Sequence, residues 1–113
     1  MSEHIKIHKA NGKWVVRAGG AILGESTNAL KLSEGDMKPV IYFPRDDIAM
    51  IFLDESDHSS HCPHKGDASY YSIQTKSTVL ENAVWSYENP IEAVAQIKGY
   101  LAFDPAQITV EEL

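Results

Sequence analysis

The only cysteine of the chain lies in a short segment that is crowded with reactive and charged side chains. Residues 61–66 read His-Cys-Pro-His-Lys-Gly, so Cys62 has two imidazoles and the Lys65 ammonium within three residues. A thiol reacts as its thiolate, which neighbouring cations favour. The segment therefore predicts either a reactive thiol, acting as a nucleophile or redox group, or an inert cysteine that packs in the core.

The histidines near Cys62 raise the question of a metal site. His58, His61, Cys62 and His64 match no standard zinc spacing, and the chain has no cysteine pair to complete one. On a strand, Cys62 and His64 would share a face while His61 pointed to the other. We therefore predict no metal site, and we expect no cofactor.

A second group of reactive side chains lies in residues 42–47, which read Tyr-Phe-Pro-Arg-Asp-Asp. The Arg45 guanidinium could bind a carboxylate or phosphate through two parallel hydrogen bonds. Asp47 could orient Arg45, or serve as the acid or base if Cys62 is catalytic. The alternative is an ordinary surface arginine, next to aspartates that stabilise the positive end of a helix.

Aromatic residues form the third group. Trp85 and Tyr87 lie two apart on a predicted strand, so both side chains project from one face. They belong either to the core or to a stacking surface for a flat ligand. Tyr70 and Tyr71 are adjacent, so at most one of them lines the same cavity.

The overall composition limits the classes of partner. The chain has 113 residues and a formal charge of −6, and its ten lysines and arginines occur singly, which argues against a nucleic-acid partner. No apolar run approaches the ~20 residues of a membrane span. One cysteine forms no internal disulfide, and residues 1–5 lack the pattern of a signal peptide. We expect a soluble cytoplasmic protein.

Hydrophobic residues alternate with period two along most of the chain, which predicts short strands. The first three strands are expected to form a meander, because Asn11-Gly12 is typical of a hairpin turn. The last strand is expected at a sheet edge, and residues 30–38 and 54–60 are expected to be loops. The eight predicted strands cover residues 5–8, 13–18, 21–27, 40–43, 67–75, 78–87, 100–103 and 107–110.

Two short helices complete the prediction. Pro44 suits the start of a helix over residues 45–50. Asn89 suits the N-cap of a second helix over residues 90–98, with Pro90 as its first helical residue. Short antiparallel strands with few helices predict one mainly β domain over residues 1–113. We expect a sandwich or an open barrel, with the helices at its corners.

These motifs, taken together, resemble a known family. Residues 42–47, 62–66, 68–71 and 85–90 are similar, in the same order, to the signature of a bacterial domain-of-unknown-function family, number 427, and the resemblance covers nearly the whole chain. That family is similar in fold to β-tent domains, in which two antiparallel sheets pack at a steep angle around a cavity. The motif residues correspond here to Tyr42, Arg45, Asp47, Cys62, Lys65, Gly66, Tyr70, Trp85 and Tyr87.

The resemblance implies little about chemistry. Several β-tent domains hold a structural zinc with two cysteine pairs, which a chain with one cysteine cannot do. Others bind small ligands in an aromatic cavity or perform thiol redox chemistry. Neither activity transfers with the fold alone.

The leading hypothesis is a small-molecule-binding domain for an anionic or strongly polar ligand. Aromatic side chains would line its pocket, and two cations would supply charge. The predicted ligand-binding residues are Tyr42, Arg45, Lys65, Tyr70, Trp85 and Tyr87.

Two further functions remain open. The first is an enzyme that uses Cys62 as nucleophile or redox thiol, with Asp47 or a histidine as acid or base. The second is a structural or interaction module, such as a homodimer that pairs through the C-terminal edge strand.

Overall fold

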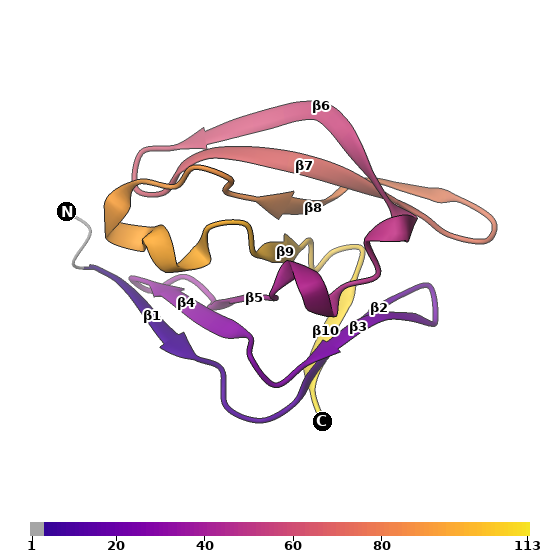
Figure 1. Ribbon diagram of the computed structural model, residues 1–113, viewed down its shortest axis with the longest axis horizontal. Helices are drawn as coiled ribbons and strands as arrows, with labels where there is room; N and C mark the ends of the chain where they lie inside the picture. Colours follow the sequence, from indigo (N-terminus) through magenta and orange to yellow (C-terminus); the bar gives the residue numbers. More distant parts are fainter. Residues whose placement is uncertain (1–3) are drawn as a thin grey trace.

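Antiparallel strands make up most of the protein, for which a computed structural model describes residues 4–113 (Figure 1). One sheet has the order β1-β4-β5, with β1 at Ile5–Lys9, β4 at Leu30–Glu34 and β5 at Val40–Tyr42. A second has the order β10-β2-β3, with β10 at Thr109–Glu112, β2 at Trp14–Ala18 and β3 at Ala21–Ser26. The third has the order β6-β7-β8-β9, with β6 at Leu53–Cys62, β7 at Gly66–Gln74, β8 at Val79–Ser86 and β9 at Leu101–Phe103.

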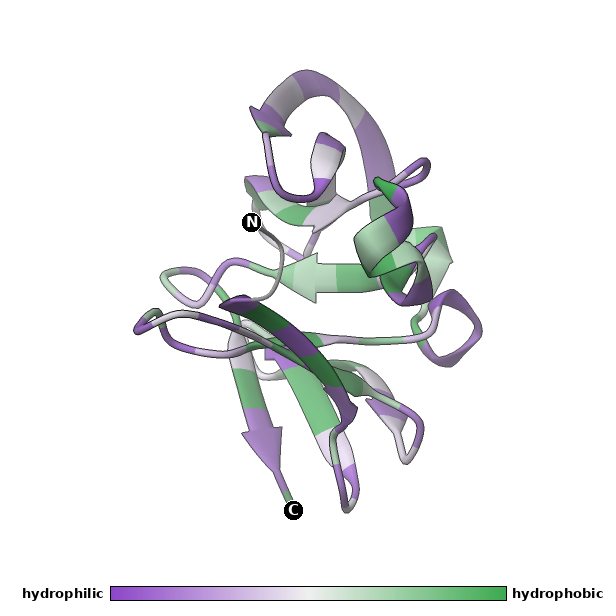
Figure 2. Cartoon of the chain, turned by 90° about the vertical axis from the view of Figure 1, so that its left-hand side faces the viewer, coloured by the Kyte–Doolittle hydropathy of each residue, from purple (hydrophilic) through white to green (hydrophobic). Residues whose placement is uncertain are grey.

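The sheets form two layers that join along one line. Figures 1 and 2 show β6, β7 and β8 on one side of the molecule and the two three-stranded sheets on the other. Phe43, directly after β5, exchanges two backbone hydrogen bonds of 2.8 and 2.9 Å with Leu101 of β9. This bridge holds the end of β5 beside the four-stranded sheet, so side chains from both layers meet there.

Two hydrophobic clusters fill the space between the elements. The larger is built around Phe43, Ile73, Val84 and Leu101. The smaller cluster lies where β4, β5, β7 and β8 meet the segment that carries Val94 and Ile97. Its buried members are Leu32, Tyr42, Ala68, Tyr87, Val94, Ile97 and Ala102. Two tyrosines within this second cluster indicate that it borders on a polar region.

The prediction of a mainly β fold is confirmed, and the described residues contain three sheets. The predicted meander of the first three strands is wrong, because β1 pairs with β4 while β2 pairs with β3. Residues 10–13 pass from one sheet to another instead of closing a hairpin, and the amide of Ala10 donates to the carbonyl of Ala29 at 2.9 Å. Alternation identifies a strand, but it does not identify the strand's partner.

Two segments predicted as loops contain strands. β6 runs through residues 54–60 and pairs with β7, although most of its side chains are exposed. An edge strand with solvent on both faces has no hydrophobic alternation. Only backbone hydrogen bonds hold it to the sheet, and these do not depend on the side chains, so the sequence does not indicate the strand. In β4, Leu30 and Leu32 do alternate with polar residues, but the turn-forming residues 33–36 obscure the pattern.

The predicted helices are short 3₁₀ turns. The first divides into η2 (Arg45–Asp47) and η3 (Met50–Phe52), because Ile48 is extended and bridges to Gly24 of β3. The second is η4 (Glu92–Ile97), which consists of two short turns that meet at a kink at Val94 and which buries Val94 and Ile97. The prediction of Asn89 as N-cap is wrong, since Ile91 precedes the first helical residue.

The C-terminal strand lies at a sheet edge as predicted, because β10 pairs only with β2 among the described strands. Its pairing with a second copy stays a prediction. Among residues 4–113, no helix is long and apolar enough to cross a membrane. The prediction about a signal peptide concerns in part residues 1–3, which lie outside the described residues.

Candidate functional site

A cavity of about 340 Å³, here called the polar cavity, lies between the β1-β4-β5 sheet and the four-stranded sheet. Five of the six predicted ligand-binding residues line it, although they come from β5, β7, β8 and the turn after β6. The lining residues are Leu32, Glu34, Met37, Lys38, Val40, Tyr42, Lys65, Tyr70, Trp85 and Tyr87.

Four aromatic side chains, Tyr42, Tyr70, Trp85 and Tyr87, form one wall of the cavity. The β7–β8 register places Tyr70 opposite Trp85, and their ring centroids lie 6.4 Å apart. The indole N–H of Trp85 donates to the hydroxyl of Tyr42 at 3.4 Å. The aromatic wall is therefore continuous across both layers.

The two buried phenols of this wall stay neutral at physiological pH. Burial raises the pKa of Tyr42 to about 12, although the indole of Trp85 opposes the shift. Burial likewise raises the pKa of Tyr87. Both hydroxyls can therefore donate or accept hydrogen bonds, but neither serves as a base.

A shielded ion pair supplies the charge of the cavity. The Lys65 ammonium donates to Oε1 of Glu34 at 2.9 Å, and the two side chains are only 14% and 15% exposed. Burial by itself lowers the pKa of Lys65, but the hydrogen bond to Glu34 and neighbouring groups raise it above its ordinary value. The bond from Lys65 lowers the pKa of Glu34 against the effect of burial. Both groups are therefore charged at neutral pH.

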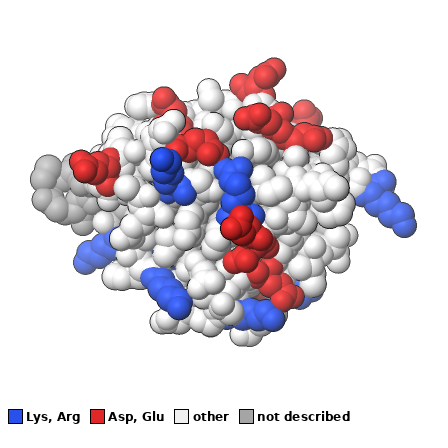
Figure 3. All heavy atoms as spheres, in the orientation of Figure 1, with Lys and Arg blue, Asp and Glu red and all other residues white. Residues whose placement is uncertain are grey.

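The ammonium of Lys65 also has capacity for a second partner. It carries three N–H groups, and one of them binds Glu34. Lys38, an exposed residue of the loop before β5, adds a second cation to the lining. On the face shown in Figure 3, by contrast, basic side chains are interspersed with acidic ones and form no continuous patch.

Arg45 does not line the polar cavity. Its guanidinium donates to the hydroxyl of Tyr71 at 3.0 Å, to the carbonyl of Gly99 at 3.2 Å and to Oγ of Ser86 at 3.3 Å. It also donates to the carboxylate of Glu88. The side chain predicted to bind a ligand thus ties η2 to β7, β8 and the segment after η4.

Cys62 and Asp47, the residues of the enzyme hypothesis, lie in different surroundings. Cys62 ends β6, is half-buried and packs against the smaller hydrophobic cluster. Asp47 ends η2, where its backbone carbonyl faces Gly24 of β3. Neither residue belongs to the lining of the polar cavity.

Half of the cavity lining was absent from the predicted site, which did not include Leu32, Glu34, Met37, Lys38 or Val40. Four of the five lie within residues 30–38, the segment predicted as a loop, and Val40 begins β5. The alternation of Leu30 and Leu32 with polar residues was the one signal for β4. A strand there would have placed Glu34 on the same sheet as Tyr42.

The histidines have several separate neighbours. His58 contacts the ring of Tyr70 at 4.5 Å between centroids, and His61 lies 2.7 Å from the carboxylate of Asp67. His64 instead lies near His4 and Glu34, and the ligand atoms of these three residues are within 4.8 Å of one another. These three residues are the described group that could hold a metal ion.

The fold and the cavity define a small, mainly β domain whose sheets enclose a polar site lined by tyrosines, a tryptophan and an ion pair. The chain belongs to the family described as Domain of unknown function (DUF427), which it matches over residues 6–112. This match confirms the resemblance seen in the motifs and covers nearly the whole chain. None of the curated proteins compared with the chain matches it.

Proposed function

We propose that the polar cavity binds a small anionic molecule that carries a flat apolar part. The observation that supports this proposal is the convergence of Lys65 with the aromatic wall, from segments far apart in the sequence. A shielded ammonium with unused donors attracts a carboxylate or phosphate group more strongly than an exposed lysine does. The rings of Tyr70 and Trp85 line the same cavity, where the flat part of such a ligand could pack against them.

The size of the cavity restricts the ligand further. Its volume of about 340 Å³ is at the lower end of the ~300–1,000 Å³ found for small-molecule sites. The carboxylate of Glu34 disfavours a second anionic group near Lys65 and favours a ligand hydroxyl or amine instead. These features favour a compact aromatic or heterocyclic monoanion over a dinucleotide.

A thermal-shift screen with aromatic carboxylates, heterocyclic acids and small phosphate esters tests this proposal. A true ligand at one hundred times its dissociation constant should stabilise the protein by about 2.7 kcal/mol. The double variant Glu34→Gln/Lys65→Met removes both partners of the ion pair, so neither charge is left buried alone. This variant should bind at least about tenfold more weakly, since charged hydrogen bonds contribute ~1.5–3 kcal/mol.

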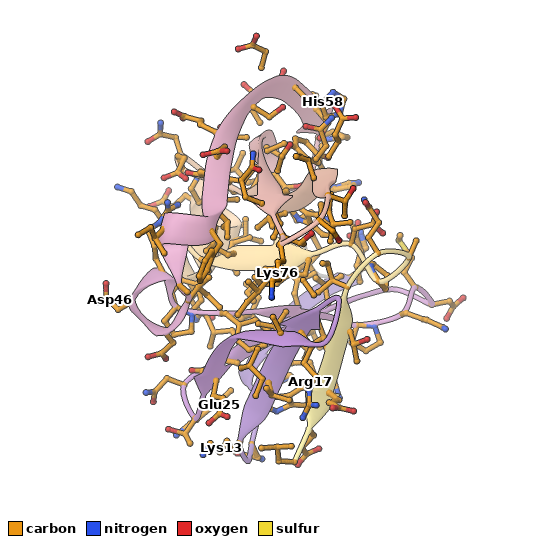
Figure 4. The ribbon with its side chains drawn as sticks, turned by 90° about the vertical axis from the view of Figure 1, so that its right-hand side faces the viewer. Lys13, Arg17, Glu25, Asp46, His58 and Lys76 are labelled. Carbon is orange, nitrogen blue, oxygen red and sulfur yellow. The ribbon has the colours of Figure 1, made fainter. Side chains whose placement is uncertain are left out.

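The matched control is Lys76→Met, which removes a lysine from the exposed turn between β7 and β8 (Figure 4). It should bind the ligand as the unmodified protein does. Equal affinity in the double variant, or no stabilisation by any class of the panel, would refute the proposal.

The enzymatic alternative has one supporting observation. The turn that carries Lys65 is closed by a 3.1 Å bond from its amide to the carbonyl of Cys62, so the thiol-bearing residue adjoins the cavity lining. Alkylation of the folded protein separates the two functions. Rapid labelling of Cys62, blocked by a ligand found in the screen, would favour an enzyme, whereas labelling only on denaturation would leave a binding domain.

A further inference from the structure

We propose that His4, Glu34 and His64 form a binding site for a divalent transition metal ion of the zinc type. The three side chains are here called the His-Glu-His cluster. Two imidazole nitrogens and one carboxylate oxygen are the ligand types that zinc accepts in sites with an open fourth position. The cluster shares Glu34 with the proposed anion site, but its two imidazoles lie outside the lining of the polar cavity.

Backbone bonds hold the three ligands near one another. The β1–β4 register places Ile5 opposite Glu34, and the amide of Gly35 donates to the carbonyl of His4 at 3.0 Å. His64 lies in the turn between β6 and β7, which is fixed by the bond from the Lys65 amide to Cys62. Three separate segments thus deliver one ligand each.

The spacing of the ligand atoms is close to that of a zinc site. Bonds of about 2.0–2.2 Å in a tetrahedron place ligand atoms about 3.3–3.6 Å apart. Nε2 of His4 and Oε2 of Glu34 already lie 3.3 Å apart. All three ligand atoms lie within 4.8 Å, and the imidazoles of His4 and His64 are 4.7 Å apart between centroids.

The environment of Glu34 favours metal binding through one oxygen. Oε1 accepts a hydrogen bond from Lys65 at 2.9 Å, which orients the carboxylate and keeps it charged. Oε2 faces His4, so the oxygen turned toward that imidazole is not the one bound by Lys65. Such a partner behind a ligand is a common feature of metal sites.

Isothermal titration of tag-free protein with zinc chloride tests the proposal. We expect one ion per chain, and we expect His4→Ala and His64→Ala each to lower the affinity at least about tenfold. His8→Ala is the matched control. His8 is an exposed histidine on β1, the strand that begins directly after His4. It should leave the affinity unchanged.

Two outcomes would overturn the proposal. One is the absence of zinc binding at micromolar concentration, and the other is equal binding by the cluster variants and the His8 control. If a variant fails to fold, histidine NMR of the unmodified protein gives the answer. Zinc should shift the ring resonances of His4 and His64 and leave those of His8, His58 and His61 in place; the reverse pattern would contradict the site.

Two variants separate this site from the anion site. Lys65→Met removes the bond that orients Glu34, so it should weaken zinc binding and anion binding together. His64→Ala removes a metal ligand that lies outside the lining of the polar cavity, so it should weaken zinc binding alone. Unchanged zinc binding in Lys65→Met, or weaker anion binding in His64→Ala, would contradict the assigned geometry.

Discussion

Replacement of Arg45 by methionine should destabilise the protein without affecting the polar cavity. The four groups that accept hydrogen bonds from the guanidinium lie 26 to 54 residues away in the sequence. Methionine keeps most of the apolar stem and removes every donor. Any loss of stability therefore reports on the hydrogen bonds.

The magnitude follows from which acceptors water can reach. Ser86 is fully buried, so its hydroxyl would lose its partner without gaining water, at a cost of about 1–3 kcal/mol. The Glu88 carboxylate is 43% exposed and would rehydrate, so it adds little. With a smaller contribution from Tyr71, we expect a loss of about 2–3 kcal/mol. For a domain of this size, that loss lowers Tm by about 8–12 °C.

Urea unfolding measures this loss, with Lys13→Met as the control. Lys13 pairs with Glu25 at 3.0 Å on the surface, where the two side chains are 51% and 39% exposed (Figure 4). Exposed pairs of this kind contribute at most about 1 kcal/mol. If Arg45→Met costs no more than Lys13→Met at an unchanged m value, the structural role assigned to Arg45 is wrong.

Three further variants test the packing and the ionisation of the site. Gly24→Ala should lower the free energy of unfolding in urea by about 1–3 kcal/mol, because the added Cβ would lie 2.2 Å from the backbone oxygen of Asp47. An unchanged urea midpoint would show that η2 can move away from β3. The pKa of Tyr42 is raised to about 12 in the folded protein. The neutral phenol therefore contributes fully to the free energy of unfolding below pH ~10, and this contribution is lost as pH rises through 12. Tyr42→Phe should therefore flatten the alkaline fall in Tm, and an unchanged slope between pH 9 and 12 would contradict the shift. Because Lys65 lowers the pKa of Glu34, the carboxylate stabilises the fold above its ordinary pKa of ~4.3 and loses this effect as pH falls through the lowered value. Glu34→Gln should be less stable than the unmodified protein at pH 7 and match it in acid; a constant difference in Tm across this range would show that the ion pair is not the cause.

The sequence predicted the fold class and half of the cavity lining because both depend on local patterns. Alternation, apolar β-forming runs and turn residues identified eight of the ten strands in residues 4–113, and strand spacing placed Trp85 and Tyr87 on one face. The same patterns could not reveal β6, whose side chains are mostly exposed. They also could not show that β1 pairs with β4, because pairing is decided by the whole sheet.

The side-chain partners depend on contacts that no spacing reveals. Arg45 is bound by acceptors from three distant segments, so its role could not be separated from ligand binding in advance. Similarly, the spacing of histidines around Cys62 reflects only neighbours in sequence. His64 lies beside His4, which is 60 residues earlier in the chain and precedes a strand of another sheet. The sequence shows which residue types are present, but the tertiary structure determines which of their side chains are in contact.

The most direct test of the anion site uses the two tryptophan indoles of the chain. The indole of Trp85 donates to Tyr42 in the polar cavity, whereas that of Trp14 donates to the carbonyl of Asn11 at 3.0 Å. In a ¹⁵N–¹H spectrum, titration with the anion that binds most tightly in the screen should shift the Trp85 indole signal and leave the Trp14 signal in place. A ligand that shifts both signals equally, or neither, would contradict binding in the polar cavity.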